Sequence, residues 1–230
     1  MKKIRLSSEF VYILGLLLLS FSVAMIASTD FGVSMIVAPA YILSLKVEAL
    51  SFGQCEYVIQ GVLFLIMCLL LGRIRPIYFS SFVTGLIYGA LLDLWRLLIP
   101  AFNPAVTAPG SLALPLRILM LAGGLALTSF SIALFFRTYF YPQVYDFFVK
   151  AVSRRFGLNR GKFKIAFDFT FLAISCLLSL LLFGRLYGVG IGTVVVTAVN
   201  GFMISGFGRV LDRFVCISPR FVRLSRYFEI

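Results

Sequence analysis

Residues 14–24, LGLLLLSFSVA, closely match residues 123–133, GGLALTSFSIA. Further blocks match in the same order and at a nearly constant spacing; they include SFGQCEYVIQ (51–60) with NRGKFKIAFD (159–168), and LLLGRI (69–74) with LLFGRL (181–186). Isolated matches between apolar helices arise by chance, whereas blocks that keep their order and spacing indicate a duplication. We therefore expect a single membrane domain over residues 1–230, with one repeat at 10–100 and a second at 118–213.

Six apolar runs in these repeats are long enough to cross a bilayer. The chain is 61% hydrophobic and 13% charged, whereas soluble proteins average about 45–50% apolar and 25% charged residues. A span needs roughly 20 mostly apolar residues, and it must be helical because lipid cannot satisfy unpaired backbone groups. The runs are Phe10–Ala27, Gln54–Leu71, Ile77–Ile99, Ile118–Phe136, Ile165–Phe183 and Val189–Phe207. The sequence predicts an all-α membrane protein with six full transmembrane helices.

Each repeat also contains a shorter apolar segment, 33–45 in the first and 139–152 in the second. At about 1.5 Å per residue, each covers roughly half a bilayer. If both segments crossed, there would be eight spans and parallel repeats. If neither crosses, the chain has six spans plus two short half-helices, and the repeats are inverted. Residues 30–56 are acidic and residues 139–164 are basic, which favours opposite sides of the membrane because Lys and Arg accumulate in cytoplasmic loops. We favour inverted repeats.

The positive charge of the chain fits this topology. The formal net charge is +12, and the basic residues flank the apolar runs. A nucleic-acid-binding protein would need a polar face to carry such a patch. We therefore expect the lipid bilayer, and no nucleic acid, as the surrounding partner. We expect a multi-pass protein of the bacterial cytoplasmic membrane, with both termini in the cytoplasm and a basic cytoplasmic tail at 214–230. The oligomeric state stays open.

The composition argues against an enzyme or a metal site. The chain has no histidine, and its four cysteines lack paired spacing, so neither a zinc site nor a disulfide framework is predicted. No constellation of nucleophile and base is recognisable, and the GxxxxGK[ST] motif of ATP-binding proteins is absent. We expect no catalytic residues, no cofactor and no metal.

The starts of the two short segments are the best candidates for a solute site. Half-helix N-termini in a bilayer offer unpaired N–H groups and a positive dipole end, which suit an anionic or hydrogen-bonding solute. Polar residues inside spans are costly and point to function. The substrate-binding candidates are Asp30, Ser34, Arg137, Gln143, Asp168 and Asn200. Structural roles stay open for three of them: Asp168 can pair with Lys164 one turn earlier, Asn200 can join two helices, and Arg137 can be a boundary residue.

Other polar and small residues are interpreted as structural. Asp93 and Arg96 lie one turn apart and are expected to pair with each other at the membrane boundary. Glycines in the spans, such as Gly89 and Gly201, are expected to let helices approach closely.

Glycine motifs occur after the first span and in two later helices. The first half contains DFGVSMIVAP at the start of residues 30–73 and TGLIYGALLDLW at 84–95, and the second half contains GIGTVVVTAVNG at 190–201. These motifs resemble those of the YczE/YyaS/YitT family of bacterial membrane proteins, over about residues 10 to 213. The resemblance implies an integral bacterial membrane protein with a transport role. That family is largely uncharacterised, so the resemblance supplies no substrate.

Two classes of function follow from these observations. Duplicated helical units are typical of secondary transporters, whose sites form where broken helices meet near the midplane. The first expectation is a transporter or exporter of an unknown, possibly anionic, small solute, with its site between the repeats. The alternative is a non-transporting accessory or regulatory membrane protein, or the substrate-binding subunit of a larger transporter.

Overall fold

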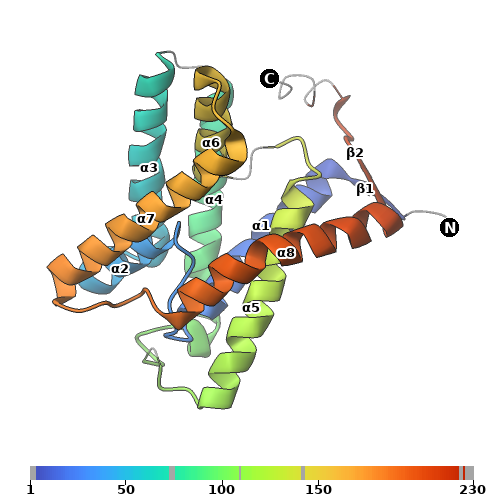
Figure 1. Cartoon of the computed structure of the whole chain (residues 1–230). Coiled ribbons are helices and arrows are strands. Elements are labelled where there is room, and N and C mark those ends of the chain that lie inside the picture. Colours follow the sequence, from blue (N-terminus) through green and yellow to red (C-terminus); the bar gives the residue numbers. More distant parts are fainter. Residues whose placement is uncertain (1–3, 73–75, 109, 141–142, 223–224, 226–230) are drawn as a thin grey trace.

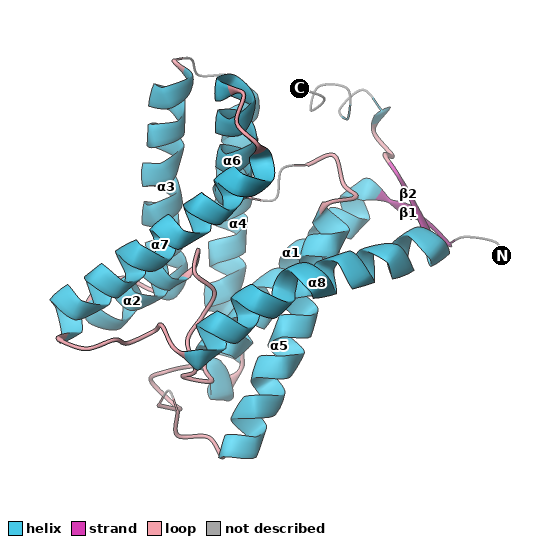
Figure 2. Cartoon of the chain, viewed as in Figure 1, coloured by secondary structure: helices cyan, strands magenta, loops and turns pink. Residues whose placement is uncertain are grey.

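The computed structural model describes residues 4–72, 76–108, 110–140, 143–222 and 225, and these form a helical protein with one short ribbon of two strands (Figure 1). The elements are β1 (Ile4–Ser7), α1 (Ser8–Ala27), α2 (Ala38–Lys46), α3 (Phe52–Leu71), α4 (Pro76–Leu98), the 3₁₀ turn η1 (Pro100–Phe102), α5 (Leu114–Phe135), α6 (Val144–Phe156), α7 (Arg160–Phe183), α8 (Ile191–Phe214) and β2 (Val215–Ser218). Helices dominate every part of the described chain (Figure 2).

Six of the eight helices, α1, α3, α4, α5, α7 and α8, are long and apolar enough to cross a membrane. This confirms the prediction of an all-α, multi-pass membrane protein. The two remaining helices, α2 and α6, have 9 and 13 residues. They overlap the predicted short segments 33–45 and 139–152 and end one and four residues beyond them. The first begins only at Ala38, because Pro39 has no backbone N–H and fits the first turn of a helix.

The centre of the structure is the packing of α1 against α5, the two helices that carry the matching SFSVA and SFSIA blocks. Ser22 Oγ lies 2.8 Å from Thr128 Oγ1, in the second half of both helices. Gly15, early in α1, faces Phe135 at the end of α5, and Ile26, late in α1, faces Gly124. The two helices therefore run in opposite directions.

The remaining contacts follow the pattern expected if a two-fold operation exchanges the two repeats. α1 packs on α4 as α5 packs on α8, and α2 packs on α3 as α6 packs on α7. Across the repeats, α3 contacts α6 and α2 contacts α7. One relation differs, because α3 and α4 lie side by side whereas α7 and α8 diverge from the loop between them (Figure 1). The repeat boundaries at 10–100 and 118–213 stay a prediction that this contact pattern supports.

The direction of α5 bears on the topology. Between α1 and α5 the chain passes through α2, α3 and α4. If all three crossed the membrane, α5 would run parallel to α1; if α2 does not cross, α5 runs antiparallel to it, as observed. The short helices also lie at opposite ends: α2 packs near Phe52 at the start of α3, and α6 packs near Met67 towards its end. Both observations support inverted repeats with two half-helices.

A close contact between glycines holds α3 against α4. A Cβ added at Gly53 would lie only 2.1 Å from the carbonyl oxygen of Gly89, so the two backbones touch. The carboxylate of Asp93 accepts a hydrogen bond from the backbone N–H of Gly53 (2.8 Å) and another from the Ser51 hydroxyl. It thus caps the N-terminus of α3, where the helix dipole is positive.

The expected pairing of Asp93 with Arg96 is therefore wrong. The cap of α3 occupies both carboxylate oxygens of Asp93, because that helix start reaches the same level as the end of α4. The guanidinium of Arg96 instead donates to the carbonyl of Phe102 (3.4 Å) and lies over the Phe52 ring.

The two ends of the described chain meet in a parallel ribbon, with Ile4 paired to Val215 and Ser7 to Ser218. The carboxylate of Glu9 accepts hydrogen bonds from the backbone N–H groups of Arg220 and Phe221. The segments before α1 and after α8 therefore lie on the same side, as an even number of spans requires. Residues 223–224 and 226–230 of the predicted basic tail lie outside the described residues.

The inverted topology predicts where a reporter fusion reads as external. A reporter inserted within residues 46–52 should report an external location, whereas reporters at residue 160 and at the C-terminus should report a cytoplasmic one, because the basic segments stay inside. Paired phosphatase and fluorescent-protein fusions measure this. An internal location for 46–52 would mean that the segment 33–45 crosses, and the repeats would then be parallel.

The glycine contact predicts a position-specific loss of stability. Gly53→Ala should lower the free energy of unfolding by about 1–3 kcal/mol, because its Cβ meets the backbone of α4. Gly201→Ala is the matched control: nothing lies within 4 Å of its added Cβ, and alanine is about 1 kcal/mol better than glycine inside a helix. Thermal unfolding in detergent compares them. Equal effects would show that the Gly53–Gly89 contact does not support the fold.

Candidate functional site

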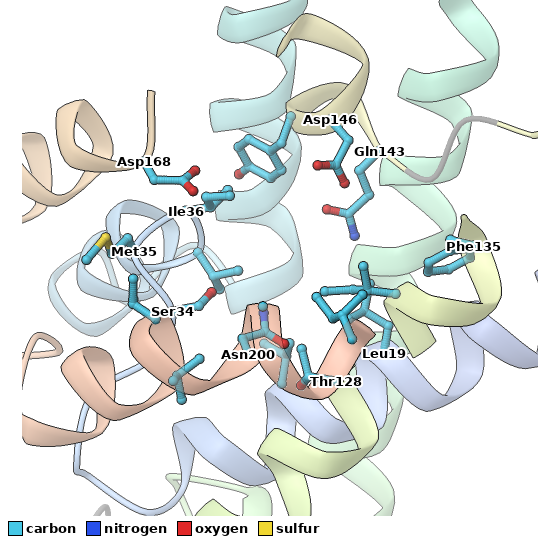
Figure 3. Close-up of a pocket in the computed structure, with 18 of the residues that line it drawn as sticks. Leu19, Ser34, Met35, Ile36, Thr128, Phe135, Gln143, Asp146, Asp168 and Asn200 are labelled. Atoms are coloured by element: carbon cyan, nitrogen blue, oxygen red, sulfur yellow. The ribbon is translucent and has the colours of Figure 1, made fainter. Parts of the chain in front are cut away.

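A cavity of about 310 Å³ lies between the two repeats (Figure 3). The first repeat contributes side chains of α1, the segment 34–37 and Tyr88 of α4. The second repeat contributes side chains from α5, α6, α7 and α8. Most of the lining is apolar and aromatic, and a small set of polar side chains interrupts it, which is the usual composition of a small-molecule site.

Four of the six predicted site residues line this cavity, namely Ser34, Gln143, Asp168 and Asn200. In Figure 3, Asp168 approaches from the left, Gln143 from above and Asn200 from below. The internal repeat pairs Ser34 with Gln143 and Tyr88 with Asn200, and all four of these residues line the cavity. Equivalent positions of the two repeats therefore meet at one place.

The polar side chains of the cavity differ in how far the protein satisfies them. Asn200 Oδ1 accepts a hydrogen bond from the Ser129 hydroxyl (2.8 Å), which joins α8 to α5. Gln143 precedes the first turn of α6 and is buried, and its Nε2 has no hydrogen-bond partner among the described residues. A buried donor without a partner is costly. Gln143 Nε2 can therefore donate a hydrogen bond to a ligand or to water in the cavity.

One lysine bridges two carboxylates at the edge of the cavity. Lys164 Nζ lies 3.1 Å from Asp168 Oδ1 and 3.6 Å from Asp146 Oδ1, so it connects α7 to the half-helix α6. The pairing of Asp168 with Lys164, one of the two roles left open for Asp168, is therefore present. The charged residues that line the cavity are these two aspartates and one lysine, so the lining has one more acidic than basic side chain.

The other two predicted residues, Asp30 and Arg137, lie elsewhere. Arg137 Nε and Nη2 donate to the carboxylate of Asp212 (2.7 and 2.6 Å), and its guanidinium also donates to the carbonyls of Ala133 and Gly208. It therefore joins the end of α5 to α8. Asp30 Oδ2 lies 3.9 Å from Nη2 of Arg117, at the start of α5.

A buried polar cluster lies behind the cavity wall, and its residues were not among the predicted site residues. The carboxylate of Glu56 is 0% exposed, and its Oε2 accepts hydrogen bonds from the hydroxyl of Tyr145 (2.9 Å) and from Nε2 of Gln60 (3.1 Å). Tyr145 itself lines the cavity. Glu56 lies near the start of an apolar run and so resembles a boundary residue. The signal that could have found it is the polar pair Glu56 and Gln60, spaced one helical turn apart within that run.

The cavity has unequal ends. On one side, residues 31–33 contact the start of α8. The backbone N–H of Gly192 donates to the carbonyl of Phe31 (2.7 Å), and a Cβ added at Gly190 would lie 2.6 Å from that same oxygen. At the other end, a second cavity of about 550 Å³ shares four residues with the first, namely Phe135, Phe136, Asp146 and Lys164. We call these two features the glycine junction and the vestibule. The central cavity thus adjoins the vestibule on the side of α6 and the start of α7.

Comparison with known proteins gives one finding. The model of a family of unknown function, DUF6198, matches residues 6–209, a range that includes seven of the eight helices in full and most of α8. No curated protein and no solved structure matches the chain significantly. The resemblance to the YczE/YyaS/YitT family stays an interpretation of the glycine motifs.

The contacts of Arg137 predict a structural role. Arg137→Ala should lower the free energy of unfolding by about 1–3 kcal/mol, because it leaves two helix carbonyls and Asp212 without their charged donor. Thermal unfolding measures this. Asp212→Asn is the comparison, and its loss should be smaller because Asp212 is exposed. A stable Arg137→Ala variant would contradict this role.

Proposed function

The chain belongs to the DUF6198 family of unknown function, and we propose that it is a carrier of a small polar solute rather than an enzyme. The observation that carries this proposal is a cavity lined by side chains of both repeats and bordered by the vestibule. We place the carrier in the bacterial cytoplasmic membrane with both termini in the cytoplasm, so that the vestibule faces the cytoplasm.

The arrangement of the half-helices supports transport. In carriers with inverted repeats, one repeat moves against the other around a site near the midplane, which opens to each side in turn. Here the glycine junction joins the loop before α2 to the start of α8, and in a carrier it would close the cavity on that side. These segments belong to different repeats, so a relative movement of the repeats would break the junction. The vestibule end has the corresponding half-helix, α6.

The lining suggests what kind of solute fits. A volume of about 310 Å³ is at the lower end of the range for small-molecule sites, roughly 300–1,000 Å³. Ser34, Thr128, Gln143 and Asn200 offer hydrogen bonds, and the aromatic rings offer apolar contact. Since two aspartates face one lysine, a neutral or positively charged solute fits better than the anionic solute that the half-helix starts suggested.

The second candidate is an accessory protein or a subunit of a larger transporter. The observation that favours it is the exposure of α7 and α8, whose most apolar windows are only 22% and 17% buried, compared with 50% in α1 and α5. Helices of a partner could cover these faces, although lipid would cover them equally well.

Accessibility of a single cysteine separates the two functions. In a variant that lacks the four native cysteines, Asn200→Cys should react with a membrane-impermeant maleimide from the vestibule side. For a carrier, Gly190→Ala should add reactivity from the opposite side, because its Cβ presses on Phe31 and opens the glycine junction. Right-side-out and inside-out vesicles measure the two directions.

Gly206→Ala is the matched control for this experiment, because nothing lies within 4 Å of its added Cβ and it should leave labelling unchanged. If Asn200→Cys is labelled from one side only, both with and without Gly190→Ala, the carrier proposal is contradicted and the accessory function is favoured. Absence of labelling from either side would mean that the cavity is not connected to water.

A further inference from the structure

We propose that Glu56 and Gln60 form a binding site for a small monovalent cation, a proton or Na⁺, behind the wall of the solute cavity. Cation binding at this site does not depend on transport. Its coupling to a solute, described below, rests on the proposed carrier function.

The unpaired atoms of this cluster are all acceptors. The donors from Tyr145 and Gln60 both reach Glu56 Oε2, which leaves Glu56 Oε1 without a hydrogen-bond partner among the described residues. Gln60 Oε1 is likewise unpartnered, and its side chain is 1% exposed. A buried polar atom without a partner costs free energy. Two such acceptors one helical turn apart require a donor or a cation, and not a further acceptor.

The described side chains that face Glu56 supply no positive charge. Tyr145 of α6 donates to it, and Tyr88 of α4 is fully buried nearby. None of the ion pairs found among the described residues involves Glu56. An isolated carboxylate in such a place is very unfavourable, so a proton or a bound ion is the group that would neutralise it.

Proton and Na⁺ satisfy the cluster by the same chemistry. A proton on Glu56 Oε1 converts an unpaired acceptor into a donor. Na⁺ would bind carboxylate and amide oxygens, the ligands that hard cations prefer. The amide of Gln60 is held in place, because a Cβ at Gly85 would lie 2.2 Å from its Oε1. This side of the cluster is therefore rigid, as an ion site requires.

Tyr145 connects this site to the solute cavity. Its hydroxyl donates to Glu56, and its side chain lines the cavity two positions after Gln143, whose amide nitrogen lacks a partner. Neutralising Glu56 weakens the charge-assisted hydrogen bond from Tyr145. The first turn of α6 would then be held less firmly, and the cavity would respond. Cation and solute binding would be coupled in this way if the protein is a carrier.

The test uses the purified full-length chain without any solute. Its thermal midpoint is measured against Na⁺ at constant ionic strength, with choline as the replacement, and against pH without Na⁺. A cation at 100 times its dissociation constant should raise the midpoint by about 5–10 °C. Glu56→Gln should remove this dependence because its amide is neutral. Glu48→Gln, an exposed carboxylate in the loop before α3, should keep it.

Each result has a defined meaning. Na⁺ dependence that Glu56→Gln abolishes identifies Na⁺; loss of only the pH dependence identifies a proton. If Glu56→Gln does not fold, two other variants test the site. Gln60→Leu should raise the Na⁺ concentration needed for stabilisation at least tenfold. A bound proton should give the infrared band of a protonated carboxyl, and this band should be absent or shifted in Glu56→Asp. Identical dependence in the wild type and in Glu56→Gln overturns the cation site, whereas the cysteine labelling of the cavity tests the carrier function separately.

Discussion

The antiparallel contact of α1 with α5 is the interaction on which the rest of the structure depends. It joins the two repeats through equivalent helices, with Ser22 of α1 in contact with Thr128 of α5. Because these helices run in opposite directions, the structure supports the prediction that the second repeat is inverted relative to the first. The crossed contacts of α3 with α6 and of α2 with α7 follow from the same exchange. The cavity lies where the equivalent residues of the two repeats converge.

The sequence predicted the six long helices and the two short ones, because length and apolar composition are local properties. It also predicted Ser34, Gln143, Asp168 and Asn200 of the cavity, because polar residues at repeat-related positions point to a shared centre. It did not predict the role of Asp93, since a cap on the neighbouring helix depends on how α3 and α4 meet. Arg137 was placed with the site because it borders a short segment, but its partner Asp212 comes from the distant end of α8.

Glu56 shows why burial is hard to infer from sequence in a membrane protein. A carboxylate near the start of a hydrophobic run is usually at the membrane surface. Here the two short helices α2 and α6 both pack on α3, and Glu56 is enclosed by protein. The same half-helices that place polar residues in the cavity therefore also bury the acidic group behind it.

The ribbon of β1 and β2 bears on how the molecule is assembled. Its strands come from opposite ends of the described chain, before the first helix and after the last. A ribosome completes β2 only after α8 has emerged, so this pairing cannot form until all the helices exist. The pairing of Ile4 with Val215 then links the segment before α1 to the segment after α8, without a covalent bond. The helices are therefore made while the N-terminal strand still lacks its partner, and the pairing of β1 with β2 is a late step of folding.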